Sequence, residues 1–290
     1  MAPAPANPWL GRRVIAYAHQ GGAWEAPSST LFAIRRALDL GATGIELDVH
    51  ATMDGSLVVS HDATVDRTTN GRGAIADLTV SQVRALDNAY WFAPGADVSP
   101  GLDPEAYPYR GRAPEDRDFG IATLEEVLDL LDEHPAVALN IDIKATAPTV
   151  EPYEDRLAVA LAAHGHSDRV IVASFLDIAS EAFSRHAPDI ATSAGTLAVA
   201  AFWRAVAQGT TPEPMRHVAL QVPAVYGERV VVDERLVESA HRAGLAVHVW
   251  TINDRDEMGR LLDLGVDGII SDLPTVLVEE LRHRHMAWQP

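Results

Sequence analysis

Short apolar runs rich in β-branched residues alternate with segments of helical periodicity along most of the chain. Runs of this kind are typical of buried parallel strands. They cover residues 14–19, 44–49, 137–144, 169–174, 190–194, 217–222, 245–251 and 267–271. The helical segments cover residues 30–40, 124–133, 153–164, 178–186, 199–208, 234–243, 255–264 and 274–284. Eight β–α units in succession predict an α/β fold, a closed (β/α)8 TIM barrel.

Helix start signals agree with these boundaries. A Ser or Thr at position 29 or 30 precedes the first helix, and Thr123 is followed three residues later by Glu126, which is the spacing of a capping box. Asn253, with Asp256 three residues later, suggests the same for the helix at 255–264. We therefore expect Asn253 to cap that helix.

One segment interrupts the alternation. Residues 57–61 form a further apolar run, joined to 44–49 through an Asp-Gly pair, which favours a hairpin. We therefore expect a small insertion after the second strand, at about residues 50–120, over the C-terminal mouth of the barrel. We expect its aromatic residues to form a lid or a substrate wall, with ordinary packing as the alternative. These residues are Tyr90, Trp91, Phe92, Tyr107 and Tyr109.

Charge and composition limit the classes of partner. The 290-residue chain has a formal net charge of −18, which disfavours nucleic acid because binding it depends on Lys and Arg. A small anionic substrate can still bind where a local cation overrides the global field. Cysteine is absent, so thiolate chemistry is excluded, and no apolar run approaches the roughly 18 residues of a transmembrane segment. No protein partner is evident.

The first residues read MAPAPANP and lack the pattern of a signal peptide. We interpret residues 1–13 as a flexible lead and residues 14–290 as a single catalytic barrel domain that carries the insertion. We expect a soluble protein. The lead suits an extracellular protein whose export signal has been removed, and a cytoplasmic protein is the alternative.

Chemically active side chains gather where predicted strands end. His19 and His61 each close a strand, and Glu46 and Asp48 lie two residues apart on another, so that both carboxylates face the same side. Two such acids repel each other unless a cation lies between them or one takes up a proton. Imidazole is the side chain best suited to proton transfer near neutral pH. These residues therefore indicate an acid–base site at the C-terminal end of a barrel.

A second strand adds to this site. Asp142 and Lys144 repeat the two-residue spacing, and three carboxylates can bind one hard divalent cation, Mg²⁺ or Ca²⁺, through oxygen. Zn²⁺ more often recruits imidazole or thiolate. Lys144 offers a second positive charge to an anion, and Trp250, which closes a later strand, is expected to line the pocket. A cation, a lysine and two imidazoles match the needs of phosphoryl transfer.

Other interpretations of the same residues remain open. Glu46 and Asp48 could bond neighbouring loop amides, and Asp142 could form only a buried salt bridge with Lys144. The site could belong to a non-catalytic barrel that binds phosphoesters. A glycosidase acid pair is disfavoured, because two carboxylates on one strand lie too close together to flank a sugar linkage.

The motifs together resemble the glycerophosphodiester phosphodiesterase family, within the superfamily of phospholipase C-like phosphodiesterases. The matching pieces run in order from about Val14 to Pro274: AHQGG, STLFAIRRALDLGATGIELDV, DGSLVVSHDATVDRTTNGRG, TLEEVLDLL, LNIDIK, VHVWTIND and GVDGIISD. The resemblance implies a TIM-type barrel with an insertion after the second strand. It assigns acid–base roles to two residues, His19 and His61, and phosphate contact to Lys144. It assigns metal ligation to Glu46, Asp48 and Asp142.

The chain departs from the family pattern at two places that concern the substrate. Relatives usually read His-Arg-Gly, so that Gln20 brings a neutral amide to the substrate where a guanidinium is usual. Ser28 stands where many relatives have Glu. The resemblance implies a substrate with a free glycerol hydroxyl that acts as the nucleophile. Glycerophosphodiesters and lysophospholipids have this hydroxyl, so a lysophospholipase D-type activity is a variant of the same hypothesis.

Overall fold

A computed structural model describes residues 7–10, 14–95, 98–144, 153–165 and 167–286, and it confirms the TIM barrel. Its parallel strands are β1 (Ile15–His19), β2 (Gly44–Ala51), β4 (Ala138–Ile143), β5 (Val170–Ala173), β6 (Ala191–Thr192), β7 (Ala219–Pro223), β10 (Ala246–Trp250) and β11 (Gly268–Ser271). They are paired in the order β6-β5-β4-β2-β1-β11-β10-β7. A bridge between Ser193 and Ala219 brings the two ends of the sheet together. All eight predicted strands are therefore present.

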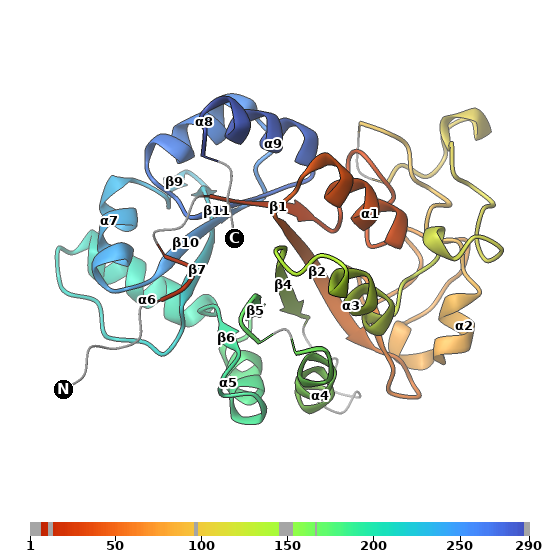
Figure 1. Ribbon diagram of the computed structural model, residues 1–290, viewed down its shortest axis with the longest axis horizontal. Coiled ribbons are helices and arrows are strands. Elements are labelled where there is room, and N and C mark those ends of the chain that lie inside the picture. The colour runs from red at the N-terminus through yellow and green to blue at the C-terminus, as the bar shows by residue number, and fades with distance from the viewer. Residues whose placement is uncertain (1–6, 11–13, 96–97, 145–152, 166, 287–290) are drawn as a thin grey trace.

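Helices surround this ring of strands (Figure 1). They are α1 (Leu31–Leu40), α3 (Leu124–Asp132), α4 (Glu154–His164), α5 (Asp177–His186), α6 (Thr196–Ala207), α7 (Glu234–Arg242), α8 (Arg255–Asp263) and α9 (Pro274–His283). Thr30 caps α1, and Thr123 and Glu126 form the predicted capping box. The prediction for α8 is wrong, because Asp254 caps it instead of Asn253. Within the described residues, no helix has the length and apolar character needed to cross a membrane.

Strand alternation explains how the barrel presents polar groups inward. Ile45, Leu47 and Val49 of β2 lie in the large core that also contains residues of α1 and α3. Their neighbours Glu46 and Asp48 therefore point into the barrel. The register pairs Glu46 with Asn140 and Asp48 with Asp142, so that the acids of β2 and β4 lie side by side.

The insertion follows β2 as predicted and lies beside α1 and α3 (Figure 1). Its strand β3 (Leu57–Val59) pairs antiparallel with β2, and a short helix, α2 (Val80–Arg84), follows. The 3₁₀ turns are Ile75–Asp77, Pro104–Ala106 and Arg117–Phe119. An apolar cluster of its own includes Val58, Ile75 and Val83. A hairpin that was not predicted, β8 (Val225–Tyr226) and β9 (Arg229–Val230), follows β7.

The aromatic residues of the insertion do not form a substrate wall, so that expectation is wrong. None of the five lines the cavity described below. Tyr109 stacks on Phe92 and Phe119 and contacts Phe32 of α1, with ring centroids 4.9–5.9 Å apart. The guanidinium of Arg110 lies 3.7–4.6 Å from the ring centroids of the other three, Tyr90, Trp91 and Tyr107. Mutual stacking and cation–π contacts therefore hold these rings within the insertion.

The expected flexible lead, residues 1–13, lies mostly outside the described residues. Of the part that is described, Asn7 donates hydrogen bonds to the carbonyls of Val218 and Gly244, at the N-terminal ends of β7 and β10. Trp9 is buried, and its ring lies edge-on to that of His248 inside the barrel, with the centroids 6.5 Å apart. These residues therefore cover the end of the barrel opposite the predicted site.

We expect His248 to make the protein sensitive to acid. Burial lowers the pKa of His248 to about 3, whereas an unfolded chain takes up this proton near pH 6.5. Below pH 6.5 the unfolded state therefore binds a proton that the folded state does not bind. Stability consequently decreases as the pH is lowered, until about pH 3. Between pH 6.5 and 4.5 we expect the free energy of unfolding of the wild type to fall more steeply than that of His248→Gln. The difference between the two slopes should be about 1 kcal/mol per pH unit. Urea unfolding at several pH values measures this, and equal slopes would contradict it.

Candidate active site

A cavity of about 830 Å³ opens at the C-terminal ends of the barrel strands. Its lining residues come from all eight barrel strands or from the segments after them, and His61 comes from the loop after β3. Seven of the eight residues predicted for the site line it: His19, Glu46, Asp48, His61, Asp142, Lys144 and Trp250. The structure therefore places both imidazoles and all three carboxylates in one pocket.

His19 is held by a carboxylate that the sequence analysis did not assign. Its Nδ1 lies 2.6 Å from Oδ1 of Asp272, which follows β11. Asn253 donates from Nδ2 to the other oxygen of Asp272 at 2.7 Å and accepts the backbone N–H of Asp272 at 2.9 Å. Asn253 thus holds Asp272, and Asp272 orients the His19 ring. In this orientation Nε2 of His19 lies 3.7 Å from Oε2 of Glu46.

Carboxylates determine the protonation of His19. Burial alone would lower the pKa of this imidazole, but the charge of Glu46 and the hydrogen bond to Asp272 outweigh it and raise the pKa to about 9. These carboxylates therefore favour the protonated form of His19. An imidazolium beside the carboxylates is in the state of a general acid.

His61, in the loop after β3, has a similar arrangement. Its Nδ1 lies 2.8 Å from Oδ1 of Asp62, and Arg67 donates from Nε to Asp62 at 2.6 Å. The hydrogen bonds from His61 and Arg67 hold the pKa of Asp62 below its usual range despite partial burial. His61 is more exposed than His19, with side-chain exposures of 43% and 20%. Each imidazole thus has one nitrogen on a carboxylate.

Two of the three carboxylates hold the ammonium group of Lys144. Its Nζ lies 2.6 Å from Oδ1 of Asp48 and 2.9 Å from Oδ2 of Asp142. Burial, followed by repulsion from Asp48, raises the pKa of Glu46 to about 8. Burial also raises the pKa of Asp142 to about 6, although Lys144 opposes this. One ammonium group therefore does not fully neutralise the cluster.

The donor set fits a hard divalent cation. In the described part of the chain, Oδ2 of Asp48 and Oδ1 of Asp142 are buried and have no hydrogen-bond partner. Buried carboxylate oxygens without a donor are costly, and a cation would satisfy both. The ligand atoms of the three predicted ligands do not all lie within 4.8 Å of one another. Two of these acids, Asp48 and Asp142, are paired with Lys144 instead.

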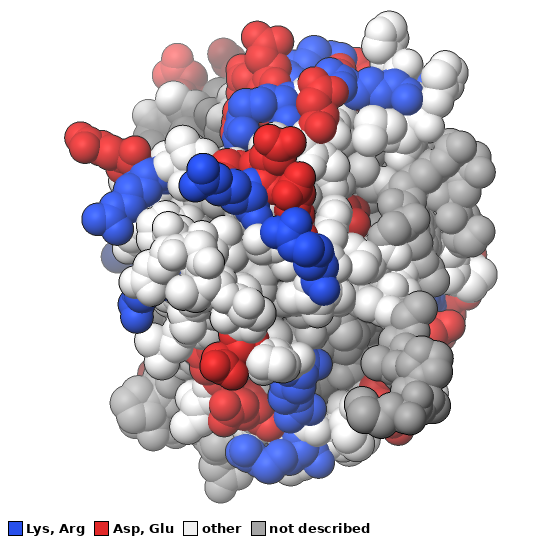
Figure 2. Space-filling view, turned by 90° about the vertical axis from the view of Figure 1, so that its left-hand side faces the viewer, with Lys and Arg blue, Asp and Glu red and all other residues white. Residues whose placement is uncertain are grey.

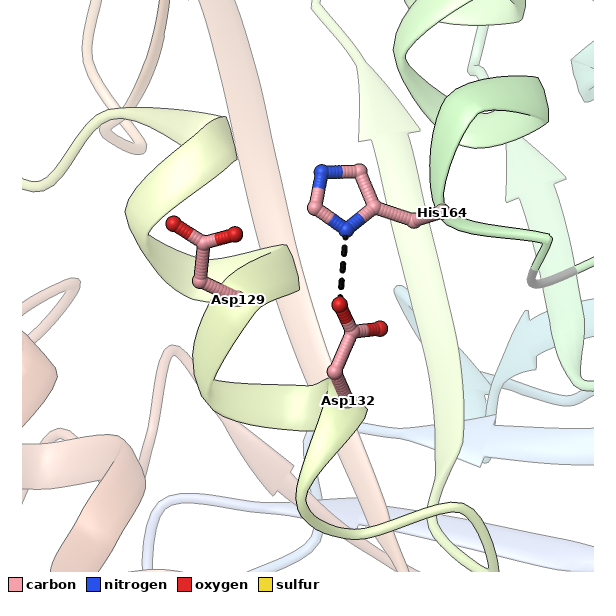
Figure 3. Close-up of side chains that lie close together, drawn as sticks. All are labelled: Asp129, Asp132 and His164. Atoms are coloured by element: carbon pink, nitrogen blue, oxygen red, sulfur yellow. Dashed lines mark hydrogen bonds and ion pairs between the residues drawn. The ribbon is translucent and has the colours of Figure 1, made fainter.

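A search of the described residues does find one trio with ligand atoms within 4.8 Å, at a different place. Asp129 and Asp132 of α3 face His164 of α4 (Figure 3). The two nitrogens of His164 lie 3.0 Å from Asp132 and 2.9 Å from Glu125. This group lies on exposed helix surfaces and has no residue in the cavity, so we interpret it as a link between α3 and α4.

Gln20 differs from its predicted place. It is buried and does not line the cavity. Its side-chain nitrogen lies 3.2 Å from Nε2 of His19, and its backbone N–H donates to Oε2 of Glu46 at 3.2 Å. The backbone at Gln20 is left-handed, with φ at 53°, which turns the chain back over the end of β1. Gln20 thus contacts two site residues, His19 and Glu46. This geometry does not favour direct contact between Gln20 and the substrate.

The other half of the cavity is apolar, and the sequence analysis identified only Trp250 there. The Trp250 ring lies edge-on to that of Phe175, with the centroids 5.5 Å apart. Trp203 of α6 and Tyr226 of the β8–β9 hairpin contribute further aromatic surface, and Val199 contributes an aliphatic one. The cavity is therefore two-sided, with charged groups at the strand ends and apolar groups toward α6.

The chain resembles known proteins over most of its length. The model of the glycerophosphoryl diester phosphodiesterase family matches residues 19–276. A glycerophosphodiester phosphodiesterase of Caldanaerobacter subterraneus subsp. tengcongensis is 32% identical over 272 residues, which are 93% of this chain and 98% of that protein. One from Bacillus subtilis is 30% identical over 269 residues, which are 90% of this chain and 84% of that protein.

Solved structures show the same fold. The glycerophosphoryl diester phosphodiesterase domain of a Mycobacterium tuberculosis protein has a TM-score of 0.76 at 21% identity and covers 93% of this chain and 99% of that one. An Oleispira antarctica phosphodiesterase, in complex with the product sn-glycerol-3-phosphate, has a TM-score of 0.70 at 22% identity and covers 93% of this chain and 97% of that one. With the family match over most of its residues, the chain belongs to the glycerophosphoryl diester phosphodiesterase family.

Proposed function

We propose that this protein is a metal-dependent phosphodiester hydrolase that releases the head-group alcohol from glycerophosphodiesters or lysophospholipids. The observation that carries the proposal is the common cavity, in which two carboxylate-backed imidazoles lie beside three acids and a lysine. The relatives named as glycerophosphodiester phosphodiesterases support the reaction class. The single-domain organisation of residues 14–290 belongs to the same proposal.

The imidazoles move protons in the proposed mechanism. One accepts the proton of the substrate's free glycerol hydroxyl as that oxygen bonds to phosphorus and closes a cyclic phosphate, which is then released or hydrolysed by water. The other donates a proton to the leaving oxygen as the bond between phosphorus and the head group breaks. His19, with a raised pKa, suits the donor role in the free protein. Lys144 holds a phosphate oxygen by its positive charge.

Glu46, Asp48 and Asp142 would hold the divalent cation, Mg²⁺ or Ca²⁺. When bound, the cation supplies charge neutralisation for the phosphodiester. The unpartnered oxygens of Asp48 and Asp142 support this assignment, and so does the raised pKa of Glu46. Lys144 would then exchange part of its contact with these acids for contact with substrate.

The apolar half of the cavity favours the lysophospholipid variant. A single acyl chain could lie against Phe175, Trp203 and Trp250, and each buried CH₂ is worth about 0.8 kcal/mol. Glycerophosphodiesters fill only the charged half. The same catalytic groups would serve both substrates, since the reacting phosphodiester is the same.

A substrate panel tests the proposal. Glycerophosphocholine, glycerophosphoethanolamine and lysophosphatidylcholine are incubated with the protein and a divalent cation, and products are identified by mass. We expect release of choline or ethanolamine from at least one of them. The absence of release from all three, with binding retained, would support the non-catalytic barrel instead.

Asp272 is expected to act as a positioning residue through His19. Replacing Asp272 with Asn keeps the side-chain shape but removes the charge that orients the His19 ring and favours its protonated form. We expect kcat to fall on the order of tenfold with little change in KM, because the substrate contacts remain. Steady-state kinetics measure kcat and KM. The matched control is Asp263→Asn, because Asp263 is an exposed acid on α8, and this variant should keep the wild-type kcat. A rise in KM with unchanged kcat would contradict the positioning role.

A further inference from the structure

Exposed apolar side chains gather around the cavity mouth. Of the ten large hydrophobic residues that are exposed in the described part of the chain, seven lie in three segments at that mouth. They are Phe175, Leu176 and Ile178 after β5, Leu197 in the first turn of α6, and Val225, Tyr226 and Val230 in the β8–β9 hairpin. We call these seven residues the mouth patch. Scattered single apolar residues are normal on a surface, but a concentration at one opening indicates an interaction site.

The mouth patch is continuous with the apolar half of the cavity. Phe175 and Tyr226 belong to both, with exposures of 56% and 76%. Leu197 directly follows Thr196, which lines the cavity and whose backbone N–H donates to the carbonyl of Phe175 at 3.1 Å. An acyl chain could therefore pass from the outer surface to the cavity wall without crossing a polar barrier.

Helix α6 next to this patch is apolar but poorly covered. Its sequence TLAVAAFWRAVA carries one charged residue, and Phe202 is its one buried side chain. Helices that are apolar on all sides are normally buried in a core or a membrane. On the side of the molecule that carries α6 and α7, charged side chains form two groups with uncharged side chains between them (Figure 2). The exposed large apolar side chain of α6, Leu197, is therefore available to an apolar partner.

The charge at the mouth differs from that of the whole chain. Arg204 of α6 and Arg229 of the hairpin line the cavity and are exposed, and no ion pair within the described residues involves either of them. Asp177, which lies between Leu176 and Ile178, and Glu228 in the hairpin turn offset these two charges. The mouth is therefore close to neutral, whereas the chain has a net charge of −18. Guanidinium groups among apolar tips suit lipid phosphates, and the overall negative charge disfavours anionic lipid.

We propose that the mouth patch docks the protein on a zwitterionic lipid surface, from which a lysophospholipid enters the cavity. The apolar side chains would insert at the headgroup boundary, while Arg204 and Arg229 contact lipid phosphates. For the identity of the substrate this inference rests on the proposed function. Docking itself is measured without turnover.

Co-sedimentation with phosphatidylcholine vesicles tests the docking. The double variant Ile178→Glu/Leu197→Glu places two carboxylates in the mouth patch at positions that do not line the cavity. Val159→Glu is the matched control, since Val159 is 70% exposed on α4 and outside the patch. We expect the wild type and the control to sediment with vesicles and the double variant to bind about tenfold more weakly. Hydrolysis of lysophosphatidylcholine carried in the vesicles should fall by a similar factor only in the double variant.

Hydrolysis of water-soluble glycerophosphocholine should be equal in all three proteins, which shows that the double variant is folded. The proposal is overturned if the wild type stays in the supernatant, or if the control loses binding as the double variant does. It is also overturned if sedimentation velocity shows a wild-type dimer that the double variant breaks, since a second copy would then cover the patch. If the wild type cleaves none of the substrates of the panel, the proposed function fails, while vesicle binding and thermal melting still report on docking.

Discussion

Replacing either His19 or His61 with Ala should lower kcat on the order of 10³-fold. Each imidazole has Nδ1 on a carboxylate, which leaves Nε2 as the nitrogen that would exchange protons with the substrate in the proposed mechanism. Alanine removes that proton path and leaves the acids and Lys144 in place. We therefore expect the Michaelis constant to change much less than kcat. Initial rates on glycerophosphocholine at saturating substrate measure the loss.

The control for this prediction is His283→Ala, which removes an exposed histidine on α9, outside the cavity. It should retain the wild-type rate. If His61→Ala also keeps the full rate while His19→Ala does not, the two-imidazole mechanism is wrong and His19 acts with another proton acceptor. An equal loss of kcat in His283→Ala would indicate that the substitutions damage the fold.

Much of the fold could be predicted from local pattern. Buried parallel strands are apolar over their whole length, and the helices between them keep an apolar face, so the eight units are visible in the sequence. The β8–β9 hairpin was missed because its apolar residues are exposed and its strands have only two residues each. Helix α6 starts three residues earlier than predicted, at Thr196, because Asp177 of another helix accepts the N–H groups of Leu197 and Ala198.

The central site was predictable because strand geometry places side chains at a period of two. Glu46 and Asp48 share a face for that reason, and barrel closure brings Asp142 beside Asp48. The groups that hold the imidazole of His19 were not predictable in this way. Asp272 reaches His19 from a strand that lies 253 residues later in the chain, and Asn253 reaches Asp272 across a loop. Such contacts depend on the closed barrel and have no local spacing.

The aromatic residues of the insertion and the amide of Gln20 lie elsewhere than the sequence pattern predicts, for a common physical reason. A Pro- and Gly-rich loop with many rings predicts a binding wall only if the rings have no partners within the loop. Arg110 supplies such a partner for Tyr90 and Tyr107. Likewise, Gln20 follows a strand end, but its left-handed backbone sets it beside His19. Side-chain direction after a strand depends on the turn, which the sequence pattern did not specify.

Removing divalent cations with a chelator should lower kcat by a factor on the order of 10³ or more. Added Mg²⁺ or Ca²⁺ should restore kcat. The cation would also stabilise the folded state, by about 3 kcal/mol at a hundredfold excess over its dissociation constant. Glu46→Gln removes one of three repelling acids, whose raised pKa reflects burial and the charge of Asp48. We therefore expect this variant to melt at a higher temperature than the wild type in chelator, and to gain little from added cation.

The control for the cation prediction is Asp132→Asn, because Asp132 belongs to the surface trio on α3 and α4. This variant should keep both cation-dependent turnover and the cation-induced rise in melting temperature. Full hydrolysis in chelator would contradict a metal-dependent reaction. If Asp132→Asn loses the rise in melting temperature and Glu46→Gln keeps it, the cation binds on the helix surface. In that case Lys144, which already lies 2.6 Å from Asp48 and 2.9 Å from Asp142, is the positive charge of the cavity.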